Sequence, residues 1–152
     1  MSAEQNDTQR RLAVDLFNEA WALLGQSART VDDDDRMLHA AHASRYHWGE
    51  VGTTINAARG EWQCSRVYAV LGRAEPALHH AARCLELTEA AAEREDFDLP
   101  FAFEALARAH AVAGADEEAE RWCTMARAAA ELIADAEDRR LVLRDLATIP
   151  CG

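Results

Sequence analysis

An internal repeat with a period of 42 residues constrains the fold more than any other feature of the sequence. A shift by 42 positions aligns SRVYAVLGRAEPALHHAARCLEL with ARAHAVAGADEEAERWCTMARAA and places Gly72 on Gly114. In both copies, helical periodicity ends at the glycine and resumes a few residues later, which predicts two antiparallel helices joined by a short turn. Repeats of this length are typical of stacked helical units, so we predict an all-α chain.

The composition supports helices along the whole chain. Of the 152 residues, 33 are alanine, 7 are glycine and 3 are proline, and alanine has the highest intrinsic helix propensity. Apolar spacing and capping residues predict about seven helices, at 8–24, 34–48, 53–71, 75–93, 99–113, 116–135 and 138–147. Gly60, inside the third of them, predicts a kink or a later start.

A chain of this length normally forms one domain, so we expect residues 1–152 to fold as a single unit. Its parts are a degenerate helix pair at 8–50, repeats at 53–94 and 99–135, and a C-terminal capping helix at 138–148.

Small residues recur in both copies, at places where paired helices must approach each other closely. They are Ser65, Ala77 and Cys84 in the first copy and Ala107, Ala119 and Ala126 in the second. This order of a small residue, an aromatic residue three positions later, a glycine turn and further small residues resembles the tetratricopeptide repeat (TPR). The sequence differs from the 34-residue TPR unit in a longer loop between copies, in Ala81 at a bulky position and in His110 at an aromatic one.

The resemblance implies antiparallel helix pairs stacked as a short right-handed TPR-like α-solenoid. In such arrays the first helix of each pair lines a concave groove. The chain also resembles a group of short bacterial proteins that carry stretches similar to HAAHASRYHWGEVG and RGEWQCSRVYAVLGRAEPAL. This second resemblance implies no particular chemistry.

Six side chains of the expected groove form the predicted binding site for a protein or peptide partner. They are Arg59, Trp62, Arg66, Phe101, Glu104 and Arg108. Arginine binds carboxylates through two parallel hydrogen bonds and stacks on aromatic rings, so we expect an acidic or C-terminal segment as the ligand. Two alternatives stay open: Glu61 and Glu104 neutralise the arginines within the chain, or the last helix or an acidic tail fills the groove. The prediction is a non-catalytic interaction or scaffold module without a cofactor.

The charged residues exclude several classes of function. The chain has 27 acidic and 16 basic residues, every basic residue is arginine, and the formal net charge is −11. Nucleic acids and anionic membranes are unsuitable partners, because both require clustered cations. Without lysine, Schiff-base and phosphate-loop chemistry are excluded. The polar start of the sequence and the lack of an apolar run of about 18 residues predict a cytoplasmic protein.

The histidines supply an alternative from a different class, a small metal-dependent enzyme or metal-binding protein. His39, His42 and His47 lie on one expected helix, at spacings that can bring metal ligands together. The pattern lacks the glutamate of the HExxH zinc motif. The favoured interpretation is that these histidines are hydrogen-bonded at an interface between helices.

The four cysteines show no motif that indicates a disulfide. Cys64, Cys84 and Cys123 fall on apolar helix faces and are expected in the core, whereas Cys151 is expected to be a free thiol near the C-terminus.

The two terminal helices each leave an apolar face that only a polar cap or a partner can cover, so either end is a candidate for a homodimer contact. The residues concerned are Phe17, Trp21 and Leu24 at one end and Leu141, Leu143 and Leu146 at the other.

Overall fold

The computed structural model of the protein describes residues 1–151, which form seven α-helices and no strand. The helices are α1 (Ala3–Leu24), α2 (Val31–Val51), α3 (Thr54–Val70), α4 (Ala74–Ala90), α5 (Asp98–Val112), α6 (Asp116–Ala130) and α7 (Ala136–Ala147). The predicted all-α class is confirmed, and the number of helices agrees with the prediction.

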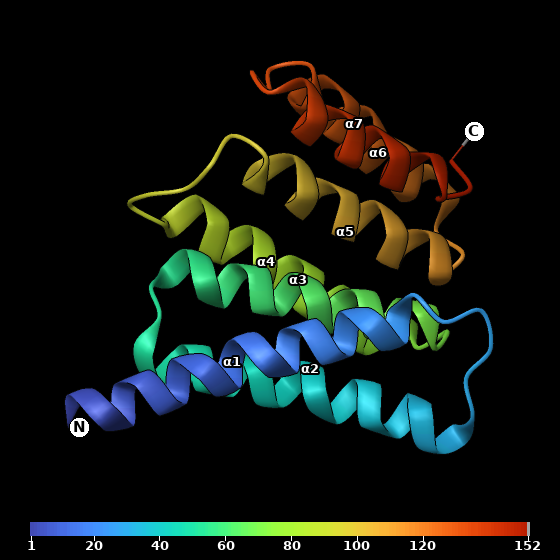
Figure 1. The fold of residues 1–152 in the computed structure, drawn as a ribbon. Helices are drawn as coiled ribbons and strands as arrows, with labels where there is room; N and C mark the ends of the chain where they lie inside the picture. The colour runs from blue at the N-terminus through green and yellow to red at the C-terminus, as the bar shows by residue number, and fades with distance from the viewer. Residues whose placement is uncertain (152) are drawn as a thin grey trace.

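The helices form pairs that stack one on the next along the chain (Figure 1). α1 packs with α2, α3 with α4 and α5 with α6, while α7 packs against α6 and α5. Three clusters of buried apolar residues connect the stack: the first lies among α1, α2 and α3, the second among α3, α4 and α5, and the third among α5, α6 and α7. Each cluster therefore joins one pair to its neighbour. The right-handedness of the stack stays a prediction.

The two copies of the repeat reverse the chain in the same way. Gly72 and Gly114 have φ angles of 73° and 74°, in the left-handed region. The residue after each glycine donates its backbone N–H to a carbonyl five residues earlier, at 2.9 Å in the first copy (Arg73 to Tyr68) and at 3.0 Å in the second. This is the Schellman ending of a helix, which favours glycine because glycine has no Cβ. The backbone thus preserves the 42-residue period.

The first two helices begin earlier than predicted, because each starts with a capping box. Ser2 Oγ accepts a hydrogen bond from the N–H of Gln5, whose side chain accepts one from the N–H of Ser2. Thr30 and Asp33 form the same reciprocal pair at the start of α2. These bonds satisfy N–H groups that the first turn of a helix leaves unpaired.

Two other helices end earlier than predicted. α4 ends at Ala90 rather than at 93, since the backbone becomes extended at Ala91. α6 ends at Ala130 rather than at 135, and the chain then turns so that Ile133 is buried in the third core cluster. Asp135 follows at once as the N-cap of α7. Burial of one apolar side chain in a connecting segment thus replaces the predicted last turn of α6.

Gly60 has a packing role. α3 begins at Thr54 and is continuous through Gly60, so the predicted later start is wrong. A Cβ at position 60 would lie 2.7 Å from Cδ and 3.3 Å from Cβ of Arg45 in α2. Glycine at this position therefore allows α2 and α3 to approach each other closely.

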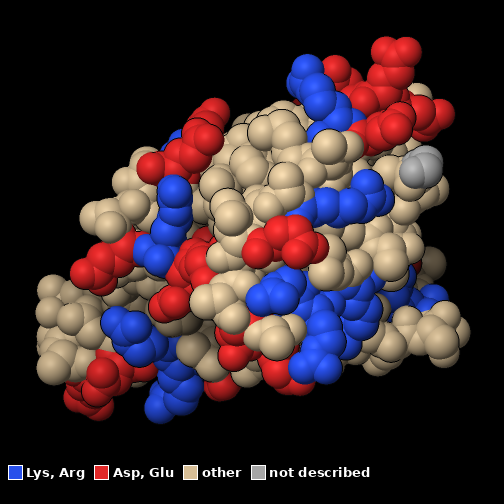
Figure 2. All heavy atoms as spheres, turned by 90° about the horizontal axis from the view of Figure 1, so that it is seen from above, with Lys and Arg blue, Asp and Glu red and all other residues tan. Residues whose placement is uncertain are grey.

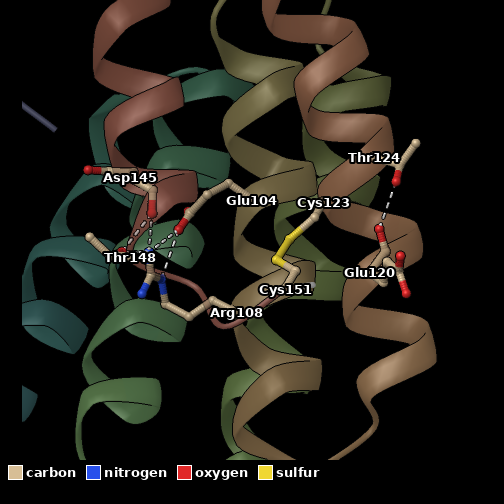
Figure 3. Close-up of a disulfide and its surroundings, with 8 residues drawn as sticks. All are labelled: Glu104, Arg108, Glu120, Cys123, Thr124, Asp145, Thr148 and Cys151. Carbon is tan, nitrogen blue, oxygen red and sulfur yellow. Dashed lines mark hydrogen bonds and ion pairs between the residues drawn. A yellow bond between two sulfur atoms is a disulfide. The ribbon is translucent and has the colours of Figure 1, made fainter.

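The expectation that Cys151 is a free thiol is wrong, whereas Cys123 lies in the core as predicted. The two residues form a disulfide that connects the C-terminal segment to α6 (Figure 3). They lie 28 positions apart in the sequence, and the intervening α7 folds back along α6, which brings them together. Cys64 and Cys84 are free and buried, as predicted.

α1 and α2, with 22 and 21 residues, are long enough to cross a bilayer. Neither of them, nor any other helix of residues 1–151, contains the apolar stretch that crossing would require.

Candidate functional site

An apolar pocket of about 210 Å³ lies between the first helices of neighbouring pairs. Its lining is dominated by five aromatic side chains from α1, α3 and the start of α5: Phe17, Trp21, Trp62, Phe97 and Phe101. Cys84 and Thr88 of α4 also line it, and both are buried. Sites that enclose a whole drug-sized ligand occupy about 300–1,000 Å³. The dimensions here suit one large side chain or a single small ring.

Aromatic rings from three helices form a continuous row along this pocket. Trp21 of α1 meets Trp62 of α3 edge to face, with ring centroids 5.4 Å apart. Trp62 meets Phe101 of α5 in the same way at 5.7 Å, and Phe101 meets Phe97 at 6.3 Å. Edge-to-face contacts of this kind stabilise aromatic pairs. Trp21 is 43% exposed, so the row reaches solvent at α1.

The polar part of the pocket is one ion pair. Arg59 donates from Nε and Nη2 to the two carboxylate oxygens of Asp98, each at 2.9 Å. The backbone N–H of Glu95 donates to the same carboxylate at 2.8 Å. These interactions raise the pKa of Arg59, chiefly through its hydrogen bond to Asp98. Since Arg59 and Asp98 are the only charged residues in the lining, the pocket carries no net charge.

A second pocket of about 160 Å³ adjoins the first. It lies among α1, α2 and α3, and its lining includes Val14 and Trp48. Phe17 and Arg59 line both pockets. These two side chains therefore form a ridge with an apolar depression on either side.

A buried charge network lies next to the aromatic row, around Glu104 of α5. The Glu104 side chain has no exposed surface. It accepts hydrogen bonds from Nη1 of Arg66 at 3.0 Å, from Nε of Arg108 at 2.8 Å and from Nε1 of Trp62 at 3.2 Å. Burial lowers the pKa of Arg66, although the adjacent Glu104 acts in the opposite direction. Two guanidiniums and one indole thus converge on a single carboxylate.

The network continues into α7. Nη2 of Arg108 donates to the backbone carbonyl of Asp145 at 3.0 Å and to the hydroxyl of Thr148 at 2.7 Å (Figure 3). The carboxylate of Asp145 lies 3.7 Å from Nη1 of Arg66. Two acidic and two basic side chains therefore balance one another where α3, α5 and α7 meet.

The six predicted groove residues all lie on α3 and α5, but the structure divides them into two sets. Arg59, Trp62 and Phe101 line the aromatic pocket. The other three, Arg66, Glu104 and Arg108, form the buried network, to which Trp62 also donates.

One alternative from the sequence holds in part, because Glu104 does neutralise Arg66 and Arg108 within the chain. Glu61 instead pairs with Arg45 and His80. Each arginine predicted to face an acidic ligand is therefore already paired within the chain, Arg59 with Asp98 and both Arg66 and Arg108 with Glu104.

Sequence reasoning missed four residues that define the pocket. Phe17 and Trp21 are one helical turn apart on α1, and that spacing is a signal that they share a face. The sequence offers no comparable signal for Phe97, or for Asp98, which lies 39 positions from its partner Arg59.

The predicted dimer faces are only partly exposed. Phe17 and Trp21 belong to the pocket. At the other end Leu146 is buried in the core, whereas Leu141 is 42% exposed. A homodimer stays a prediction.

The histidines of the metal-site alternative point to different partners. Nε2 of His42 lies 2.8 Å from the hydroxyl of Tyr68, and Nδ1 of His47 is hydrogen-bonded to Gln9 of α1. His39 is exposed. Within residues 1–151, no group of three or more histidine, cysteine or acidic side chains is arranged to hold a metal ion.

A second polar cluster fills the space among α2, α3 and α4. Nδ1 of His80 is hydrogen-bonded to Glu61, and the rings of His80 and Tyr68 are stacked, with centroids 5.6 Å apart. Burial raises the pKa of Glu61, but its bonds to His80 and Arg45 outweigh this effect, and the pKa is lowered. Burial, followed by the proximity of His80, lowers the pKa of His42. These groups form hydrogen bonds within the cluster, and they line neither of the two pockets described above.

Figure 2 shows charged side chains of both signs among broad uncharged areas on one face of the molecule. Arginines gather in a broad patch toward its lower edge, and acidic side chains group at the upper right. The acids that begin α6 and α7 contribute pairs one turn apart, such as Glu118 with Arg121 and Glu137 with Arg140. Such exposed pairs contribute little to stability.

Comparison of the chain with protein-family models, with curated proteins and with solved structures finds no match.

Proposed function

We propose that the protein is a non-catalytic binding module of the TPR type, which holds a segment of a partner protein on the face formed by α1, α3 and α5. The observation that carries the proposal is the aromatic pocket, whose row of rings crosses three consecutive first helices and reaches solvent at Trp21. Aromatic side chains dominate the energetics of protein interfaces because they bury a large area with few rotatable bonds.

The proposal changes the expected chemistry of the ligand. Arg66 and Arg108 are bonded to Glu104 in the interior, and each guanidinium-bearing side chain is only 15% exposed. An acidic segment would have to compete with these internal carboxylates. A large apolar side chain, in contrast, matches the lining of the pocket without breaking any ion pair.

The chemistry of the pocket supports a binding role over a catalytic one. Cys84 is the nucleophilic side chain in the lining, and burial raises the pKa of its thiol to about 12. A thiol of this kind stays protonated near neutral pH, whereas a nucleophilic cysteine requires the thiolate. Thr88 lies beside it with no base within hydrogen-bonding distance.

Selection from a random peptide library displayed on phage, followed by calorimetric titration of the enriched peptides, tests this function. We expect enriched sequences to share a large apolar residue. The Trp21→Ala variant should bind these peptides about tenfold more weakly, as for an interface hot spot. Tyr46→Ala is the matched control, because Tyr46 is an exposed aromatic residue of α2 outside both pockets.

The proposal is wrong if selection yields no reproducible sequence, or if Trp21→Ala and Tyr46→Ala bind the selected peptides equally well. Enrichment of acidic sequences whose binding depends on Arg66 and Arg108 would instead support an acidic ligand.

A further inference from the structure

The ion pair between Arg59 and Asp98 lies in the lining of the aromatic pocket. Resting on the function proposed above, we infer that this pair selects an uncharged segment, one that places a large apolar side chain in the pocket and a main-chain carbonyl against Arg59. Such an uncharged segment differs from the acidic ligand that the sequence predicts.

The charges of Arg59 and Asp98 balance each other in the pocket. Asp98 is 5% exposed and accepts hydrogen bonds from both Nε and Nη2 of Arg59, so the arginine neutralises its negative charge. An anion in the pocket would face a neutralised arginine and a nearby carboxylate. A cation would face a neutralised carboxylate and the guanidinium. Burial of an uncompensated charge in an apolar site is costly in either case, so a neutral occupant fits best.

Arg59 retains hydrogen-bonding capacity beyond its pair with Asp98. Its Nη1 makes no hydrogen bond to any residue of the described chain, and its side chain is 39% exposed. A guanidinium has five N–H donors in a fixed plane, of which two point to Asp98. Nη1 can therefore donate to a neutral acceptor such as a peptide carbonyl, and the rigid pair with Asp98 fixes its direction.

Arg59 and Phe17 form the ridge between the two apolar pockets, of about 210 and 160 Å³. A segment lying across the ridge can place one apolar side chain on each side, with the intervening main chain over Arg59. Apolar pockets with a few fixed polar groups are the usual arrangement for oriented binding.

Three probes that share an N-acetylphenylalanyl group test the inference: N-acetylphenylalaninamide, which is neutral, N-acetylphenylalanine, which is an anion at pH 7.5, and the 2-aminoethylamide of N-acetylphenylalanine, which is a cation. None contains tryptophan, so binding is followed by the indole N–H signals of Trp21 and Trp62 in NMR spectra. We expect the neutral probe to bind the natural protein about threefold to tenfold more tightly than either charged probe.

Two substitutions reverse the preference in opposite directions. Asp98→Asn leaves Arg59 uncompensated, and the anion should become the tightest probe. Arg59→Met leaves Asp98 uncompensated, and the cation should become the tightest. Arg121→Gln, at an exposed pair on α6, is the control and should keep the preference for the neutral probe. Thermal unfolding of each variant verifies that it is folded at the temperature of the titration.

The outcomes separate this inference from the proposed function. Equal binding of the three probes, or an order that neither substitution changes, overturns the inference and leaves a peptide-binding pocket in place. Tightest binding of the anion by the natural protein overturns the inference in favour of an acidic ligand. If no probe shifts either indole signal at millimolar concentration, both the inference and the proposed function are wrong.

Discussion

The two copies of the repeat share a backbone and differ in what they bury. Both end their first helix in the same glycine turn, and both carry an arginine at the equivalent positions 66 and 108. Between α2, α3 and α4 the interior is polar, with His42, Glu61 and His80 bonded to one another or to their neighbours. One period later these positions are Cys84, Phe103 and Trp122, and the rings of Phe103 and Trp122 are in contact.

The 42-residue period thus determines where the helices turn and where they approach each other closely. It does not determine whether the side chains buried between the helices are polar or apolar. Trp62 and Glu104 occupy equivalent positions and bond to each other across α3 and α5. The two copies are thus complementary at this position, because one carries the hydrogen-bond donor and the other the acceptor.

Removal of Glu104 tests this complementarity most severely. Glu104→Ala leaves Arg66 and Arg108 without their common carboxylate in a buried site, and loss of one partner of a buried ion pair costs about 3–5 kcal/mol. Urea unfolding followed by circular dichroism measures the change. Glu118→Ala, which removes one partner of an exposed pair, is the control and should change stability by less than about 0.5 kcal/mol. Equal effects of the two substitutions would mean that the network does not stabilise the fold.

The disulfide is the next largest difference between the copies, since Ala81 stands at the position equivalent to Cys123. Closing a loop of this length lowers the conformational entropy of the unfolded chain, which stabilises the folded state by about 3.6 kcal/mol. Reduction should therefore lower the free energy of unfolding by about that amount, as measured by urea unfolding with and without a reductant. Cys151→Ser is the control, because the reductant should have no further effect on it. Unchanged stability on reduction, with thiol counting to verify that the bond is broken, contradicts the prediction.

A smaller difference separates Ser65 from its equivalent, Ala107. Ser65 Oγ donates to the carbonyl of Ala77 at 2.8 Å in a buried position. Ser65→Ala should cost about 0.5–1.5 kcal/mol, the net contribution of one hydrogen bond. Ala107→Ser should change stability by less than this, since the repeat places the carbonyl of Ala119 where the new hydroxyl can reach it. A large loss for Ala107→Ser, measured by thermal unfolding, would show that the copies are not equivalent at this contact.

The smallest expected effect is a pH dependence of the free energy of unfolding that arises from the polar interface among α2, α3 and α4. The pKa of His42 is lowered from its ordinary value of 6.5, so the unfolded chain binds more protons than the folded one as pH falls through 6.5. The stability that neutral His42 contributes is present above pH 6.5 and is lost at lower pH. Between pH 7 and 5 the free energy of unfolding should fall less steeply for His42→Gln than for the natural protein. Parallel slopes would contradict this assignment. The lowered pKa of Glu61 acts in a lower window, below its ordinary value of 4.5.

The sequence predicted the parts of the structure that depend on local rules. Gly72 and Gly114 were identifiable because the ending of a helix in the left-handed region favours glycine. Helical spacing, combined with the resemblance to the TPR, predicts that Trp62 and Phe101 face the same side, and both line the aromatic pocket. The capping box of Ser2 and Gln5 also follows a local rule, and α1 begins before the predicted residue 8 because its first turn is polar and lies outside the apolar spacing.

The remaining features depend on contacts between distant parts of the chain. No local pattern indicates that Arg59 pairs with Asp98, or that Phe17 and Trp21 of α1 complete a pocket with α5. The bond between Cys123 and Cys151 likewise exists only because α7 folds back along α6. Such pairs depend on how helices are stacked, and one sequence gives only their order.

The disulfide also determines how the molecule responds to mechanical load. A pull applied at Cys151 is transmitted through the S–S bond to Cys123 within α6, and it bypasses the residues of α7 between them. α7 cannot be peeled away from that end as a terminal helix ordinarily would be. Under force the load enters α6 at Cys123, while α7 lies in the part of the covalent ring that the S–S bond bypasses.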